Sequence, residues 1–215
     1  MSLIESLKRK GKAMVKRAIC FLIVVVLSAV LSSGHADACV GKSLVIGSVN
    51  GPDNSVMAEM LSILITERTG TTVVVKSFGD YKSLGEAMKK GELDIMLDYT
   101  GRCYIEVLGK QQEEDSAKVF SSVKEVYQRD MNLVWLEPFG FSDAGVLGGK
   151  GGKTPSVAAP VVRKDTLGKF PALPRVINKL SGKIDNKVMS RLVAESGNGN
   201  TKKATRKFLK DNRLI

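Results

Sequence analysis

The sequence predicts an α/β fold, a three-layer sandwich in which helices cover both faces of a mainly parallel sheet. First, short apolar segments alternate with stretches whose apolar residues recur every three or four positions. Strand–helix–strand units of this kind build parallel sheets. Second, the 215 residues are 43% hydrophobic and 26% charged, which is typical of a globular protein and excludes a wholly disordered or fibrous chain.

Local signals predict the elements of the first half in order. Strands are expected at 43–48, 71–76, 93–97 and 132–136, of which the second is rich in β-branched residues. Pro52 and Asp53 suit the first turn of an amphipathic helix, which ends at Gly70. Further helices are expected at 81–90, at about 100–108 and at 115–129.

The alternation stops at a glycine-rich segment. Residues 145–155, GVLGGKGGKTP, have almost no apolar content and predict a flexible connector. The GKT at 152–154 resembles the end of a phosphate-binding loop, but Leu147 stands where that loop requires glycine. A strand is expected at 157–162, and a helical C-terminal third begins at Lys164. The strand order is expected to start 2-1-3, with further strands added.

Ligands of such sheets bind beyond the carboxyl ends of the strands, here residues 48–50, 98–101 and 137–140. The single histidine, His35, precedes the predicted domain, so a histidine-based triad, a zinc finger or a helical HExxH site is not available there. The carboxylates near the strand ends lack a nucleophile or metal ligands beside them. We therefore expect no enzyme, no cofactor and no metal site.

Residues 1–38 have the three parts of a secretory signal peptide. Six basic residues precede an apolar run of 14 residues, Ala18 to Leu31, and Ala36-Asp37-Ala38 offers small residues to a signal peptidase. Cleavage before Cys39 would export the chain to the periplasm. An uncleaved membrane anchor is the alternative, but 14 apolar residues are short for a span.

The mature chain would carry 27 basic and 20 acidic residues, a formal +7 in place of +11. Such a charge indicates a solvated surface or a loose attraction to anionic lipid headgroups. Nucleic-acid binding is not expected, because no basic run is interleaved with aromatic residues. Cys39 fits a lipid-attachment sequence poorly, so a lipid anchor is disfavoured. An oxidising compartment would permit a Cys39–Cys103 disulfide, although the sequence does not show that the two are within bridging range.

Several motifs together resemble one family. VIGSVN (45–50) resembles the first strand of that family and the loop after it. EAMKKGELDIMLDYTG (86–101) is similar to the family's "EAL-x-x-GEIDI-x-x-EYTG". VWLEPFGFSD (134–143) resembles "VWLDPLGFNN", and AAPVVRKDTLGKFPAL (158–173) resembles its return strand and next helix. The chain thereby resembles the substrate-binding proteins of ABC importers for glycine betaine, choline and related quaternary ammonium compounds (the ProX/OpuAC-like group). The second and fourth motifs are specific only in combination.

The resemblance implies a single lobe of a type II periplasmic binding protein. Such proteins have two lobes that close on a ligand, and about one lobe of sequence is absent here between the two crossings. The implied organisation is a signal peptide at 1–38, the first part of the lobe at 39–144, a linker at 145–156 and the return strand with the C-terminal helices at 157–215. A lobe of this size can still bury an ordinary core.

The resemblance also implies a ligand site. A quaternary ammonium ion donates no hydrogen bond, so aromatic faces recognise it. Tyr99 keeps the tyrosine of "EYTG", but Gly145 replaces that of "NNTY", which leaves half an aromatic cage at best. The expected ligand-binding residues are Tyr99, Tyr81, Asn50, Asn54, Thr100 and Asp143, the last as a counter-charge.

Structural roles compete with these assignments. Tyr99 could pack on a neighbouring helix, and Tyr81 could be a surface turn residue. Asp98 and Thr100 are favoured as caps of the helix that begins there. Trp135, within an apolar strand, is expected in the core.

Two functions fit these observations. The first is an exported, single-lobe solute-binding component of an ABC-type glycine betaine/choline transport system, which binds a cationic osmolyte weakly or docks on the membrane subunits. The second is a periplasmic interaction or regulatory module that has lost the small ligand. The sequence leaves open whether a homodimer rebuilds a two-lobed cleft.

Overall fold

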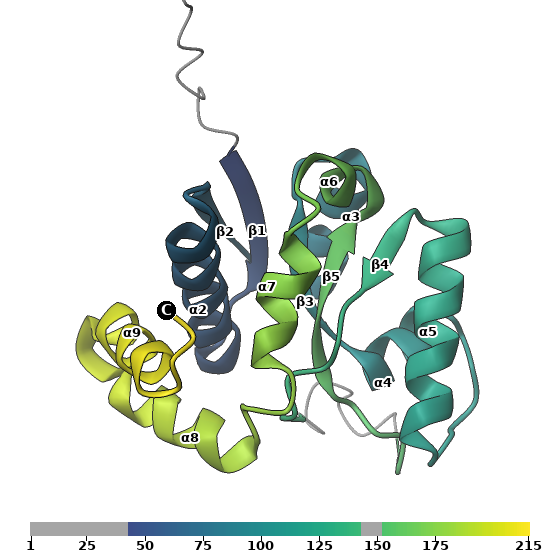
Figure 1. Cartoon of the computed structure of the whole chain (residues 1–215). Helices are drawn as coiled ribbons and strands as arrows, with labels where there is room; N and C mark the ends of the chain where they lie inside the picture. The colour runs from purple at the N-terminus through teal and green to yellow at the C-terminus, as the bar shows by residue number, and fades with distance from the viewer. Residues whose placement is uncertain (1–42, 143–151) are drawn as a thin grey trace, which may run out of the picture. The chain divides into compact units, whose positions relative to one another are not determined.

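Five strands of the described chain form one sheet: β1 Ser43–Val49, β2 Thr72–Phe78, β3 Ile95–Tyr99, β4 Leu133–Trp135 and β5 Ala158–Arg163. The structure is a computed structural model that describes residues 43–142 and 152–215. The strand order is β2-β1-β3-β5-β4 (Figure 1). β1 is parallel to β2 and β3, whereas β5 is antiparallel to β3 and β4. The predicted 2-1-3 order is confirmed, whereas the sheet is mixed, because β5 runs against both of its neighbours.

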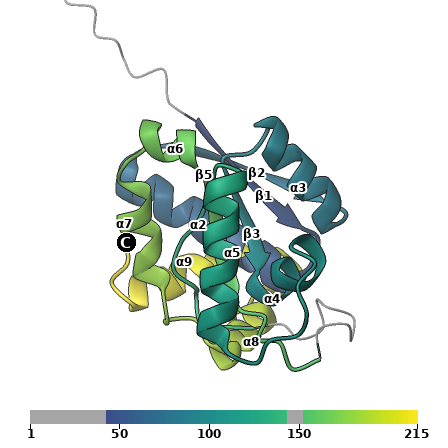
Figure 2. The ribbon, with the colours of Figure 1, turned by 90° about the vertical axis from the view of Figure 1, so that its right-hand side faces the viewer.

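Helices cover both faces of the sheet (Figures 1 and 2). One face carries α2 Pro52–Thr69, α7 Leu173–Ile177, α8 Asn186–Glu195 and α9 Thr201–Asp211, and the other carries α3 Tyr81–Lys90 and α5 Ser116–Asp130. The short α6 Lys164–Lys169 follows β5. Alternate residues of β3 enter the two cores: Leu97 faces α2, whereas its neighbour Met96 faces α3 and α5.

Local signals set the ends of the helices as the sequence predicts. Gly70 ends α2 and Gly91 ends α3, both with positive φ, in the left-handed conformation that glycine adopts without strain. Asp80 precedes α3, and its side chain accepts a hydrogen bond from the Ser83 amide at 2.7 Å. The helix expected at 100–108 is α4 Thr100–Arg102, which continues as the π-helical segment η1 Cys103–Val107.

Two expectations need correction. α2 is not an ordinary amphipathic surface helix, because it lies between the sheet and the C-terminal helices and buries side chains on most of its circumference. The predicted connector is packed where the structure describes it. Thr154 and Ser156 are buried, and the Thr154 hydroxyl accepts a hydrogen bond from the Glu113 amide at 3.2 Å.

Asp94 joins three parts of the fold at the start of β3. Its Oδ2 accepts a hydrogen bond from the Val45 amide of β1, and its Oδ1 accepts one from the Thr166 hydroxyl of α6, each at 2.8 Å. Its carbonyl oxygen accepts a further bond from the Arg163 amide at 3.1 Å. The aspartate of GELDI is therefore a structural residue that ties the return segment to the first strand.

We predict that Asp94→Ala lowers the free energy of unfolding by about 2–4 kcal/mol, because two hydrogen bonds to a half-buried carboxylate are lost. Urea denaturation followed by circular dichroism measures this loss. The exposed neighbour Glu92 gives the control, and Glu92→Ala is expected to change stability by less than about 0.5 kcal/mol. Equal stability of the two variants would contradict the structural role of Asp94.

Candidate functional site

Three aromatic rings meet at the carboxyl end of β3. Tyr99 is the last residue of the strand and only 2% exposed. Its ring packs edge-to-face against Tyr81, at 6.3 Å between centroids, and against Phe141, at 6.2 Å. Tyr81 is the first residue of α3 and is half-buried. The two predicted tyrosines therefore lie together, but Tyr99 has almost no surface left for a ligand.

A guanidinium group lies over the Tyr81 ring. The Cζ of Arg102 is 4.5 Å from the ring centroid, within the range of a cation–π interaction. Arg102 also donates two hydrogen bonds to Asp98, from Nε to Oδ1 at 2.7 Å and from Nη2 to Oδ2. Glu106 adds a weaker ion pair, with 3.7 Å between Nη1 and Oε2. An internal cation thus already occupies one face of Tyr81.

Burial and charge balance at this pair. Arg102 is 7% exposed and Asp98 is 1% exposed. Burial disfavours the charge on Arg102, but the neighbouring carboxylate of Asp98 outweighs it and raises the pKa of the guanidinium above its ordinary range. Removal of either Arg102 or Asp98 would leave the other charge buried and unpaired, which is strongly destabilising. The folded protein therefore keeps both side chains in this position.

A cavity of about 580 Å³ adjoins this cluster on the α3 and α5 side of the sheet. Tyr81, Asp98 and Arg102 form one end, and Met96 and Tyr127 belong to its lining. Charged groups of both signs surround it, namely Asp80, Lys82, Glu86, Lys89 and Glu106. The volume admits a small organic ion, and the aromatic ring with its acidic neighbours suits a cation.

Asp98 and Tyr99 point to opposite faces of the sheet, as neighbours in a strand do. Tyr99 belongs to the core under α2, whereas Asp98 faces the cavity near α3. Tyr81 contacts both cores at the edge between them. Of the two predicted tyrosines, whose rings are in contact, Tyr81 is the one that also lines the cavity.

The remaining predicted residues are dispersed. The Asn54 side chain donates a hydrogen bond to the Tyr81 hydroxyl at 3.4 Å, so it lies in the cluster. Asn50 is exposed at the end of β1. Asp143 and Cys39 lie outside the described residues, so their roles stay predictions. Cys103 is fully buried.

The capping roles favoured for Asp98 and Thr100 are wrong. Tyr99 holds the capping position, and no side chain makes a capping hydrogen bond to α4, although Asp98 Oδ1 accepts one from the Tyr99 amide at 2.7 Å. The Thr100 hydroxyl instead accepts a hydrogen bond from the Val157 amide at 3.0 Å and lies 3.4 Å from the Pro155 carbonyl oxygen, to which it donates. Asp98 pairs with Arg102. Trp135 is in the core as expected, 1% exposed and edge-to-face with Tyr127.

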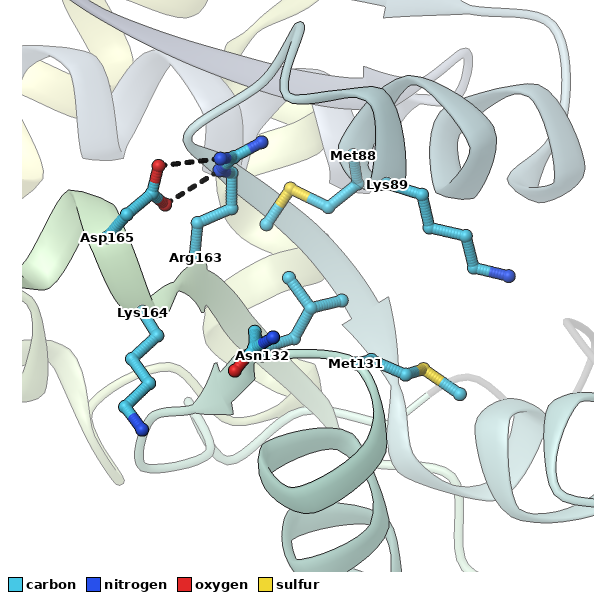
Figure 3. Close-up of a pocket in the computed structure, with 8 residues that line it drawn as sticks. Met88, Lys89, Met131, Asn132, Arg163, Lys164 and Asp165 are labelled. Atoms are coloured by element: carbon cyan, nitrogen blue, oxygen red, sulfur yellow. Dashed lines mark hydrogen bonds and ion pairs between the residues drawn. The ribbon is translucent and has the colours of Figure 1, made fainter.

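A second cavity, of about 490 Å³, lies near the amino end of β4 (Figure 3). Arg163 donates two hydrogen bonds to Asp165, which holds the pKa of that carboxyl at about 2. Met88 and Met131 belong to its lining, together with Lys89 and Lys164, whose side chains extend in different directions in the view. Among the predicted ligand-binding residues that the structure describes, none lines it. The cavity at Tyr81 is therefore the better candidate site.

The described residues contain no cluster of metal ligands and no membrane-spanning helix. Within 43–142 and 152–215, no three or more His, Cys, Asp or Glu side chains are grouped as they would be around a metal ion. In the same ranges, no helix has the length and apolar character needed to cross a membrane.

Residues 42–148 match the OpuAC family model, the substrate binding domain of an ABC-type glycine betaine transport system. The match covers just under half of the chain. The match includes Tyr81, Tyr99 and Arg102, and it ends within the glycine-rich segment. It agrees with the resemblance that the sequence motifs indicate.

Curated proteins that are similar to this chain include transport proteins. The carnitine transport binding protein OpuCC of Listeria monocytogenes is 27% identical over 153 residues, which are 68% of this chain and 46% of the relative. The ergothioneine transport permease/ergothioneine binding protein EgtU of Helicobacter pylori is 22% identical over 144 residues, or 65% and 25% of the two chains. The chain therefore spans less than half the length of these relatives.

Solved structures show the same fold. The glycine betaine/carnitine/choline ABC transporter structure aligns with a TM-score of 0.69 at 15% identity, over 81% of this chain and 99% of the other. Apo YehZ from Escherichia coli aligns with a TM-score of 0.69 at 16% identity, over 81% and 100%. At these identities the likeness concerns the fold, which is that of type II periplasmic binding proteins.

Sequence reasoning missed Arg102 at the centre of the candidate site. The signal was present, because Asp98 and Arg102 are four residues apart at the start of a helix, where opposite charges meet. The cation–π contact between Arg102 and Tyr81 could not be predicted from the sequence. The two residues are 21 positions apart, and only the packing of their helices on the sheet brings them together.

Cys103 and Tyr127 lie beside the Asp98–Arg102 pair. Burial raises the pKa of the Cys103 thiol well above its ordinary 9.0 and the pKa of the Tyr127 phenol above its ordinary 10.0. The unfolded chain releases these protons near the ordinary values, whereas the folded chain keeps them. Stability is therefore full below about pH 9 and falls as the pH rises further.

We predict that the free energy of unfolding falls above pH 10, with Tyr127 contributing up to about 1.4 kcal/mol per pH unit. Urea denaturation across the alkaline range measures the slope. Tyr127→Phe removes the titrating hydroxyl and is expected to flatten it, while lysine titration stays common to both proteins. Parallel slopes for the two proteins would contradict the assignment.

Proposed function

We propose that this protein is the solute-binding component of an ABC-type importer for quaternary ammonium compounds such as glycine betaine, choline or carnitine. The observation that carries the proposal is the cavity beside Tyr81 and Asp98 at the carboxyl end of β3, inside the segment that matches the family. The proposal includes export after cleavage of residues 1–38, action as a single lobe over 39–144 and 157–215, no catalysis, and docking on the transporter's membrane subunits.

The site supports weak binding. A cation over one tyrosine contributes about 0.5–2 kcal/mol, and full cages combine several such faces. Here Tyr99 is buried, and Arg102 covers one face of Tyr81. A ligand must use the other face or displace the guanidinium from it. Millimolar affinity, about −4 kcal/mol, is therefore expected.

The same observations favour a second function if binding is absent. Buried Tyr99 and the internal cation on Tyr81 are what a lobe would retain after it stopped binding the small ligand. The lobe would then serve as a periplasmic interaction or regulatory module. A homodimer that rebuilds a cleft is a further arrangement under either function.

The test is isothermal titration of residues 39–215, which contain the compact unit Lys42–Ile215, with glycine betaine, choline and carnitine. Circular dichroism first verifies folding. We expect saturable millimolar binding, abolished by Tyr81→Ala and retained by Tyr81→Phe, which keeps the ring. Tyr99→Ala is unsuitable, because removal of a buried ring destabilises the fold by about 3–5 kcal/mol.

Asp98→Asn combined with Arg102→Met removes both charges of the buried pair and frees the Tyr81 face. This double variant is expected to tighten binding between about twofold and thirtyfold. A flat titration for both folded proteins would refute solute binding and favour the interaction module.

A further inference from the structure

The charges of the chain are divided between its two described segments. Residues 43–142 contain 10 Lys and Arg against 15 Asp and Glu, whereas residues 152–215 contain 15 against four. The first segment is thus net acidic, and the positive charge of the described residues comes from the segment that holds the C-terminal helices.

α8 and α9 carry much of this charge on one surface. They pack on each other and on α2, on the face of the sheet opposite α3 and α5 (Figures 1 and 2). Lys203, Lys207 and Lys210 recur at four and three positions along α9, and all three are exposed. Lys187 and Arg191 form a similar exposed stripe on α8.

The two stripes adjoin. Arg191 and Lys207 line one small crevice between the helices, and Lys203 and Lys207 line the next. We call the surface made of Lys187, Arg191, Lys203, Lys207 and Lys210 the α8–α9 basic face. Arg191 pairs with Glu195 and Lys207 with Asp211. Within the described residues, no acidic group lies within 4.0 Å of the Lys187, Lys203 or Lys210 ammonium.

The basic face lacks the apolar centre of a protein–protein interface. The exposed large hydrophobic side chains of the described chain are Val74, Val75 and Val107, all outside α8 and α9. Phe208 is buried, so no exposed aromatic residue of these helices offers a stacking platform for nucleic acid bases. The α8–α9 basic face therefore offers positive charge without apolar or aromatic contacts, which suits a surface of many dispersed anions.

We propose that the α8–α9 basic face docks the domain on a bilayer surface of anionic phospholipids. The lysines contact headgroup phosphates and remain hydrated, as polybasic segments do at such surfaces. This inference is independent of the solute-binding proposal.

The experiment is vesicle sedimentation of residues 39–215, because the apolar run at 18–31 would itself insert into lipid. Vesicles in which a third of the lipid is phosphatidylglycerol are compared with pure phosphatidylcholine. Binding to the anionic vesicles alone is expected, with loss near 1 M salt, where charges are screened beyond about 3 Å.

Replacement of Lys187, Lys203 and Lys210 by Gln is expected to lower partitioning by about a hundredfold, roughly fivefold for each lysine. The matched control replaces the exposed α3 residues Lys82, Lys89 and Lys90 by Gln, which gives the same net charge. Its partitioning is expected to change less than about threefold. Circular dichroism and titration with double-stranded DNA accompany both variants.

Equal losses in the two triple variants would overturn the proposal, because net charge rather than this face would then govern binding. Binding to neutral vesicles as strong as to anionic ones would overturn it too. Retention of DNA without vesicle binding would assign the face to nucleic acid instead.

Discussion

The pairing of β3 with β5 is the constraint on which the rest of the structure depends. The strands pair from Ile95 with Val162 to Tyr99 with Ala158, and hydrogen bonds fix both ends of β3 to the return segment. Asp94 binds the Thr166 hydroxyl at one end, and Thr100 binds the Val157 amide at the other. Because β5 lies between β3 and β4, residues after the glycine-rich segment complete a sheet that the earlier residues cannot close.

The same strand end supplies the candidate site, so stability and binding draw on shared residues. Tyr99 fills the core under α2, and Asp98 holds Arg102 against Tyr81. In this cavity the Arg102 guanidinium already lies over one face of Tyr81, where a cationic ligand would bind. For the proposed function this arrangement predicts weak binding, or none, and the proposed docking surface on α8 and α9 is independent of it.

Local chemistry made much of the fold predictable. Gly70, Gly91 and Asp80 define helix ends through short-range conformational preferences, and alternating apolar residues define the strands. Long-range contacts decided the rest. The burial of α2 depends on helices more than a hundred residues later, and Thr100 binds a segment 57 positions away instead of capping its own helix. In the site, the tyrosines were predictable from motifs, whereas strand alternation, which the motifs do not express, places Tyr99 and Asp98 on opposite faces of the sheet.

Native-state hydrogen exchange tests most directly whether β5 is an integral part of one lobe. If the pairing governs the fold, the amides of β5 exchange only by global unfolding, with the same free energy as those of β1 and β3. Exchange of β5 through a separate, lower-energy opening, while β1 and β3 stay protected, would contradict the account. The residues after the glycine-rich segment would then be an appendage and not the closing strand of the sheet.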